Sequence, residues 1–164
     1  MFDNVIGQQE LKARLTQMME ENRIPHAMLL CGPRGAGKLA MAMAFAEQLC
    51  PSPLDRHCSY PVIRTASMTA DHKAISADFA DEWREMLEQG LYFSINDWLE
   101  AMGATSQQAI ITVGESDELI RKLSLRPSQG KYKTSIIWLP ERMNADCANK
   151  LLKLLEELDP SVDV

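Results

Sequence analysis

A glycine-rich heptapeptide is the feature that most constrains the fold of this chain. Residues 32–38 read GPRGAGK and fit the pattern G-x-x-x-x-G-K. They follow an apolar run, 27–31, which predicts a strand buried on both faces, and they precede an Ala-, Met- and Leu-rich segment, 38–49, which predicts a helix. In this context backbone N–H groups can cradle phosphate oxygens while the lysine reaches the terminal phosphates. The alternative is a glycine turn that merely joins strand to helix, and the lysine spacing disfavours it.

Strands and helices alternate along the rest of the chain. Apolar periodicity and stop signals predict helices over 8–22, 79–90, 94–102, 116–125 and 144–158, and strands over 60–64 and 135–139. Asn144 is expected to cap the last helix. Trp83 and Trp98 are expected to pack helices against the sheet, with base stacking as the alternative. This alternation predicts an α/β fold with a mainly parallel sheet.

Composition narrows the class of protein. The chain has 164 residues, of which 46% are hydrophobic and 24% charged, as in an ordinary domain with one core. Its longest apolar runs are far shorter than the roughly 18 residues that cross a bilayer, and its start lacks the features of a signal peptide. We therefore expect a cytoplasmic protein with no membrane partner, whose four cysteines need no disulfide partners.

Charge is distributed unevenly along the chain. The formal net charge of −6 argues against a strongly basic nucleic-acid binder that acts alone. The segment 71–100 holds eight acidic residues against Lys73 and Arg84, so it accounts for the whole surplus. A basic stretch follows it: Arg121, Lys122, Arg126, Lys131 and Lys133. A solvated helix end is the expected meaning of this stretch, and contact with DNA phosphates or an acidic neighbour is the alternative.

Two positions argue against efficient nucleotide hydrolysis. Leu39 follows the lysine where the motif requires Ser or Thr, whose hydroxyl holds Mg²⁺. The strand expected over 135–139 ends at Pro140-Glu141, without the pair of acids that a hydrolytic member uses there. We therefore expect no catalytic residue and no Mg²⁺. An active ATPase that uses Glu141 and an unconventional metal site is the alternative.

Five segments occur in the order seen in bacterial clamp-loader subunits. They are FDNVIGQ at 2–8, IPHA at 24–27, the glycine loop at 32–38, WLPERMN at 138–144 and ANKLLKLLEE at 148–157. With these segments the chain resembles the delta-prime subunits of DNA polymerase III, in the form found in Bacteroides-like bacteria. The resemblance covers essentially the whole chain, and the final segment is more specific than the glycine loop.

The resemblance implies a P-loop NTPase domain of the AAA+ class, a three-layer sandwich over residues 1–164 with a family-specific insertion over 51–110. Delta-prime subunits act as stators and not as ATPases, and Trp138 and Leu139 stand where active relatives have Asp-Glu. Residues 5–7 match the segment that lines the adenine site. The expected nucleotide-binding residues are Val5, Ile6, Gly7, Gly32, Pro33, Arg34, Gly35, Ala36, Gly37, Lys38 and Leu39.

The implied ligand is ATP, ADP or a phosphate-like anion at the glycine loop. The implied partners are the other clamp-loader subunits and, through the assembly, the sliding clamp and primed DNA. A nucleotide-binding module in another pathway is the remaining alternative.

The sequence departs from the family pattern in two places. Cys50 and Cys58 approximate the first two ligands of a four-cysteine zinc module, but Pro61 and Arg64 stand where the others belong. Since a structural zinc site needs four ligands, we expect no zinc. The chain also ends at Val164, before the sensor strand, arginine finger, lid and collar of the family, so we expect a truncated domain.

Overall fold

Two short parallel strands organise the fold. The computed structural model describes residues 2–104 and 106–157, and within them β1 (Arg56–Ser59) pairs in parallel with β2 (Thr134–Ile137). The register places Arg56 opposite Thr134 and Ser59 opposite Ile137. The chain between the two strands is 74 residues long and contains several helices. It is the long crossover connection that a parallel pair of strands requires. The predicted α/β class with a parallel sheet is confirmed.

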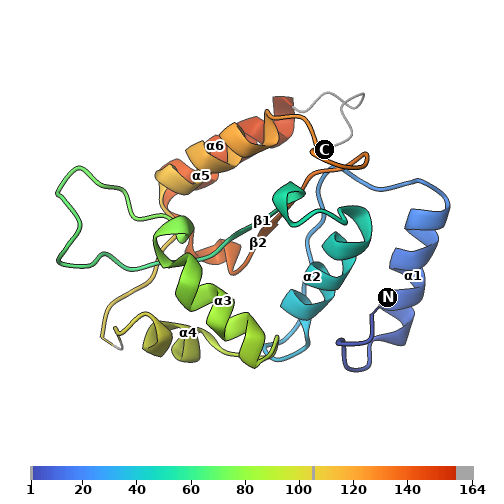
Figure 1. Ribbon diagram of the computed structural model, residues 1–164, viewed down its shortest axis with the longest axis horizontal. Helices are drawn as coiled ribbons and strands as arrows, with labels where there is room; N and C mark the ends of the chain where they lie inside the picture. The colour runs from blue at the N-terminus through green and yellow to red at the C-terminus, as the bar shows by residue number, and fades with distance from the viewer. Residues whose placement is uncertain (1, 105, 158–164) are drawn as a thin grey trace.

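Helices lie on both sides of these strands. The bounds of the helices are α1 (Gln9–Glu20), α2 (Lys38–Leu49), α3 (Ala80–Gln89), α4 (Ile95–Ala101), α5 (Val113–Leu123) and α6 (Ala145–Glu157), with short 3-10 turns η1 (Pro53–Asp55), η2 (Ser76–Phe79) and η3 (Pro140–Arg142). In Figure 1, α5 and α6 run together along one side of the strands, α3 and α4 lie on the other, and α1 and α2 stand at one end. No described helix is both long and apolar enough to pass through a bilayer.

All six predicted helices are observed, with ends within three residues of those predicted: the largest difference is at α5, which is Val113–Leu123 where 116–125 is expected. The helix predicted over 38–49 has the observed bounds of α2, since no glycine or proline interrupts it. Ser94 and Asp97 form a capping box at the start of α4, in which each side chain accepts the other's backbone N–H. Asn144 caps α6, where its Oδ1 accepts the Cys147 N–H at 2.9 Å. Leu158, the expected last residue of that helix, lies outside the described residues.

Two strand predictions need correction. The apolar run 27–31 belongs to no strand among residues 2–104 and 106–157, and Leu29 is 74% exposed. A strand is buried on both faces only when it lies within a sheet whose two faces are covered by other elements. A continuous apolar run cannot show whether those elements are present. Of the strand expected over 60–64, Val62 forms only an isolated antiparallel bridge with Ile110, and the regular strand lies four residues earlier, as β1, whose sequence RHCS is largely polar. Ser59 of β1 is buried and its other three residues are half-buried.

An aromatic cluster forms the main core on the side of α3 and α4. The ring of Tyr60 stacks on Trp83 with centroids 4.0 Å apart, and Trp98 meets both rings edge-on. Trp98 is fully buried, and its indole N–H donates to the Pro61 carbonyl at 2.7 Å. The expected packing role of Trp83 and Trp98 is confirmed.

A second core joins the N-terminal segment to α1 and α2. Phe2 and Val5 are buried against Leu15 of α1 and against Met41 and Phe45 of α2. Because these residues come from three consecutive segments, the cluster fixes where the chain enters α1 relative to the start of α2.

We predict that Trp98→Ala lowers the free energy of unfolding by about 3–5 kcal/mol, because it removes a fully buried indole and leaves a cavity. Leu29→Ala is expected to change it by less than about 0.5 kcal/mol, because that side chain already lies in solvent. Urea unfolding followed by circular dichroism measures both. Comparable losses in the two variants would show that 27–31 is a buried strand after all.

Candidate nucleotide-binding loop

The glycine loop occupies residues 32–37 and leads directly into α2. Gly35 and Gly37 have φ angles of 78° and 79°, a left-handed conformation that other residues adopt at a cost. Gly37 is the residue before the first turn of α2, and no side chain caps that helix. The positive end of α2 therefore faces the loop, as in anion-binding loops of this pattern.

Lys38 is held by the loop itself. Its ammonium group donates to the carbonyl oxygens of Gly32 and Pro33, at 2.8 and 2.7 Å. The lysine thus lies over the loop, and residues 32–35 around it are exposed. A phosphate that entered the loop would compete with these two carbonyls for the same ammonium group.

Leu39, the next residue of α2, belongs to the aromatic core. It is 8% exposed and packs in the cluster that contains Tyr60, Val62 and Trp83. Its side chain fills space between α2 and the sheet, so the position that would hold a metal-binding hydroxyl serves packing.

The structure brings the N-terminal segment to the glycine loop. The Gln8 side-chain amide donates to the Ala36 carbonyl at 3.4 Å. The Lys12 ammonium donates to the Val5 carbonyl at 2.6 Å and holds the segment to α1. Val5 is buried, whereas Ile6 and Gly7 are exposed beside the loop. The residues predicted from two distant parts of the sequence therefore lie side by side.

One residue at this junction is absent from the sequence prediction. Tyr92, in the connection between α3 and α4, accepts the Ile6 backbone N–H on its hydroxyl at 2.8 Å. Its ring also lies against Gly37. Nothing in the local sequence indicates this contact, because 86 residues separate Tyr92 from Ile6.

The residues that follow β2 carry aromatic and apolar side chains. Trp138 packs against Trp83 and Phe93, with ring centroids 5.4 and 5.2 Å apart. Leu139 follows with a φ of 57°, an uncommon conformation for leucine, and directly precedes η3. Glu141 lies exposed in η3. The only carboxylate between 134 and 143 therefore belongs to a surface turn.

Comparison with known proteins places this chain in the class of clamp-loader replication proteins. The sequence profile of the family described as "DNA polymerase III, delta subunit" matches residues 7–163, and the chain belongs to that family.

Several curated relatives are also subunits of replication complexes. The chain is 28% identical over 157 residues to DNA polymerase III subunit tau/gamma of Haemophilus influenzae, covering 95% of this chain and 19% of the relative. Identity to subunit tau of Bacillus subtilis is also 28% over 157 residues, covering 95% and 23%. A 48-residue stretch is 44% identical to replication factor C small subunit 2 of Pyrobaculum aerophilum, covering 29% and 15%. The chain thus spans about a fifth of the DNA polymerase III relatives. No solved structure matches it.

The cysteines expected to approximate a zinc module are separate thiols. Cys50 is buried, and its Sγ donates to the Tyr132 carbonyl at 3.1 Å. Burial raises the pKa of the Cys50 thiol and that of the Cys58 thiol, which disfavours the thiolate form that binds metal. Within the described part of the chain, no group of three or more His, Cys, Asp or Glu is placed to hold a metal ion.

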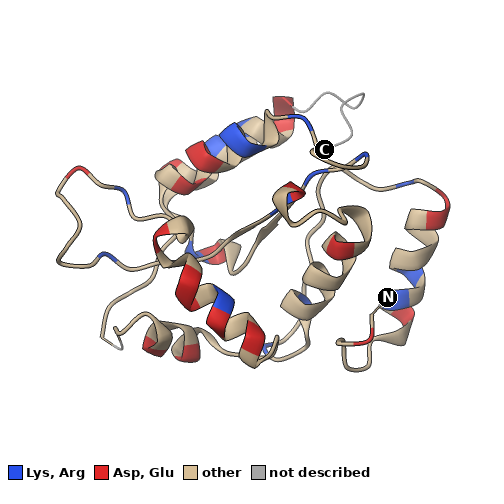
Figure 2. Ribbon diagram, viewed as in Figure 1, with Lys and Arg blue, Asp and Glu red and all other residues tan. Residues whose placement is uncertain are grey.

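Most cations of the basic stretch have partners inside the molecule. Arg121 and Lys122 pair with Glu118, and Lys133 donates to the Lys122 carbonyl at 2.7 Å. These contacts favour the solvated helix end over a DNA-binding patch. Six of the eight acidic residues of 71–100 lie instead on α3 and α4, at the opposite side of the strands (Figure 2), and Asp71 and Asp78 precede α3.

A buried polar network lies between β1 and α5, around Glu115. The Glu115 carboxylate accepts hydrogen bonds from the Ser76 N–H at 2.8 Å, from the Ser76 hydroxyl and from His57 Nε2 at 3.3 Å. The Lys122 ammonium lies 2.9 Å from His57 Nδ1, and since an ammonium can only donate, Nδ1 accepts and Nε2 carries the proton.

The residue types in this network resemble those of a hydrolase, but their geometry differs. Ser59 Oγ and Glu115 both approach the same imidazole nitrogen, Nε2, whereas a catalytic triad needs serine and acid on opposite nitrogens. Ser59 is also buried. The network therefore orients α5 against β1 and supports no nucleophilic chemistry.

We predict that Glu115 makes stability pH-dependent below pH 5. Burial alone would raise its pKa, but hydrogen bonds from His57, Ser59 and Ser76 outweigh this effect and lower the pKa from 4.5 to about 2. A lowered pKa adds stability above pH 4.5 that is lost as pH falls toward 2, amounting to about 3 kcal/mol. Urea unfolding at pH 7, 5, 4 and 3 measures the free energy of unfolding of wild type and of Glu115→Gln. The difference between the two proteins should be largest at pH 7 and should shrink as pH falls.

Asp117→Asn is the matched control, because Asp117 lies on the same helix and forms an exposed ion pair with Lys150. Its pH profile should follow that of wild type. A constant difference between wild type and Glu115→Gln across this range would contradict the prediction.

Proposed function

We propose that this chain is a delta-prime-like stator of a DNA polymerase III clamp loader, which helps to load the sliding clamp on primed DNA and has a degenerate nucleotide site. Its family membership supports the clamp-loader role. The observation that carries the stator role is that Leu39 and Trp138 both pack in one aromatic core.

The two positions matter because hydrolysis needs both of them. A hydroxyl after the loop lysine holds Mg²⁺, and an acid at the end of the next strand holds the metal and orients the attacking water. In this chain both side chains are apolar and pack in the same cluster, where Trp138 lies against Trp83. No rotamer change can supply the missing oxygen ligands, so binding and hydrolysis are separated at this site.

The proposed ligand is ATP, ADP or a phosphate-like anion. Residues 32–38 would hold the phosphates through backbone N–H groups and the Lys38 ammonium, and residues 5–7 would line the base. Such a ligand would supply negative charge to the positive end of α2 and would tie α2 to the N-terminal segment. Its role is therefore structural, and neither Mg²⁺ nor zinc is part of the proposal.

The proposed architecture is that of an AAA+ domain, a three-layer sandwich over residues 1–164 with an insertion over 51–110. Helices on both sides of a parallel pair of strands support it (Figure 1). The proposed partners are the other clamp-loader subunits, with the clamp and primed DNA reached through the assembly. The relatives named as tau, tau/gamma and replication factor C subunits support this choice.

We predict that the protein releases phosphate from Mg-ATP no faster than its Lys38→Ala variant, because the site lacks both metal ligands. A continuous phosphate-release assay measures the rate. Turnover that disappears in Lys38→Ala would overturn the stator role and favour the active ATPase. Glu141→Gln would then show whether Glu141 is the unconventional acid.

Assembly provides the second test. When the gene product is co-expressed with the tau/gamma and delta subunits of the same cell, we expect it to co-elute with them on size exclusion. Lys38→Ala should assemble equally well, because a stator does not depend on turnover. Failure to bind any of these subunits would contradict the clamp-loader role and favour a nucleotide-binding module of another pathway.

A further inference from the structure

Tyr92 connects the two segments of the candidate nucleotide site. Its hydroxyl accepts the Ile6 backbone N–H at 2.8 Å. A Cβ atom placed on Gly37 would lie 3.0 Å from the same hydroxyl oxygen and 3.2 Å from ring carbon Cε1. The phenol ring therefore covers the last glycine of the loop while its hydroxyl reaches the N-terminal segment.

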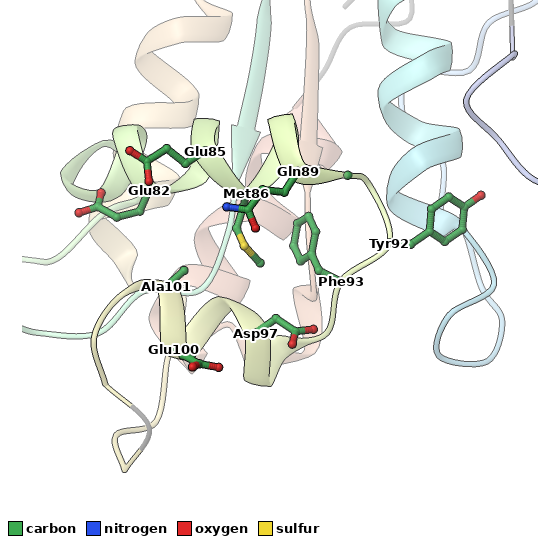
Figure 3. A pocket seen from close by; sticks show the side chains of 10 residues that line it. Glu82, Glu85, Met86, Gln89, Tyr92, Phe93, Asp97, Glu100 and Ala101 are labelled. Atoms are coloured by element: carbon green, nitrogen blue, oxygen red, sulfur yellow. The ribbon is translucent and has the colours of Figure 1, made fainter.

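The position of Tyr92 is set by its two neighbours in the chain. Leu91 packs with the second core, against α1 and α2, and Phe93 packs with the aromatic core. The connection between α3 and α4 thus spans both cores. Tyr92 lies at the edge of the acidic pocket that α3 and α4 line, and in Figure 3 its ring lies beside α2.

We propose that Tyr92 is a latch on the nucleotide site, which competes with the ligand for the Ile6 amide. The inference rests on the proposed function, because it takes residues 5–7 and 32–38 as the two halves of that site. A nucleotide with phosphates on the loop and its base beside residues 5–7 must span the interval from Gly37 to Ile6. Tyr92 spans the same interval, so the two cannot be accommodated together.

The latch can open without unfolding its surroundings. Tyr92 is 42% exposed, and the Ile6 side chain is 76% exposed, so neither is held by close packing on all sides. Rotation of the Tyr92 side chain breaks one hydrogen bond and leaves Leu91 and Phe93 in their cores. The closed and open forms therefore differ in one side chain and one amide.

The test is the affinity of the ligand-free protein for ADP, measured by titration calorimetry without metal. Tyr92→Ala is expected to bind ADP roughly tenfold more tightly than wild type, the effect of one hydrogen bond of ordinary strength. Tyr92→Phe removes the acceptor but keeps the ring, and should show a smaller gain. In the Tyr92→Ala background, Lys38→Ala should abolish the gain, which places the binding on the loop.

Tyr132→Phe is the matched control, because it also removes a phenol hydroxyl that makes one hydrogen bond, here to Asn22. It should bind ADP as wild type does. Amide hydrogen exchange tests the contact without a ligand: the Ile6 amide should exchange faster in Tyr92→Phe than in wild type. Urea midpoints close to that of wild type would show that the variants are folded.

Pyrophosphate separates the latch from a general effect on the loop. It occupies the phosphate half of the site alone, so its affinity should rise less than that of ADP in Tyr92→Ala. Equal or weaker ADP binding in Tyr92→Ala, undetectable binding in both proteins, or a gain that survives Lys38→Ala would each overturn the latch. Assembly with clamp-loader subunits is a separate readout, so failure of the clamp-loader role is distinguishable from failure of the latch.

Discussion

The stacking of Tyr60 on Trp83 is the contact on which most of the structure depends. Tyr60 directly follows β1, and Trp83 lies in α3, so the stacked pair holds the helices of the acidic segment to the sheet. Trp98 of α4 packs edge-on against Trp83, and Trp138, which follows β2, packs against Trp83 as well. Aromatic rings bury large areas, and their mutual geometry is specific, so such a cluster can fix several elements at once. A sheet of two four-residue strands provides few hydrogen bonds and needs this support.

The aromatic core also explains the character of the candidate nucleotide site. Leu39 extends the core from α2, and Trp138 extends it from β2. In a hydrolytic relative these are the positions that bring oxygen ligands to a metal. A buried hydroxyl or carboxylate without a partner would be costly among these rings, whereas leucine and tryptophan add packing. Under the proposed function, the absence of hydrolysis and the packing of the core are thus two consequences of the same side chains.

The sequence predicts those elements whose signals are local. The bounds of α2 follow from an uninterrupted run of helix formers, and the start of α4 follows from Ser94 and Asp97. Strand predictions are less successful because strand burial depends on neighbours that the strand does not encode. Residues 27–31 are apolar but exposed except for Leu30, and β1 is largely polar but buried or half-buried. For the same reason the glycine loop could be predicted from its motif, whereas the Tyr92 contact with Ile6 required the fold.

At this site, the structural change needed to admit a ligand is much smaller than the change needed to hold a metal ion. Restoring metal ligands at Leu39 and Trp138 would place polar groups in a packed core, and the surrounding rings would have to rearrange. Opening the loop to a ligand requires only that one exposed tyrosine release one amide. Because Tyr92 is positioned by Leu91 and Phe93, any partner that shifts the connection between α3 and α4 would also act on the glycine loop. The acidic segment, which lies outside the sheet, thereby has a direct physical connection to the site where a phosphate would bind.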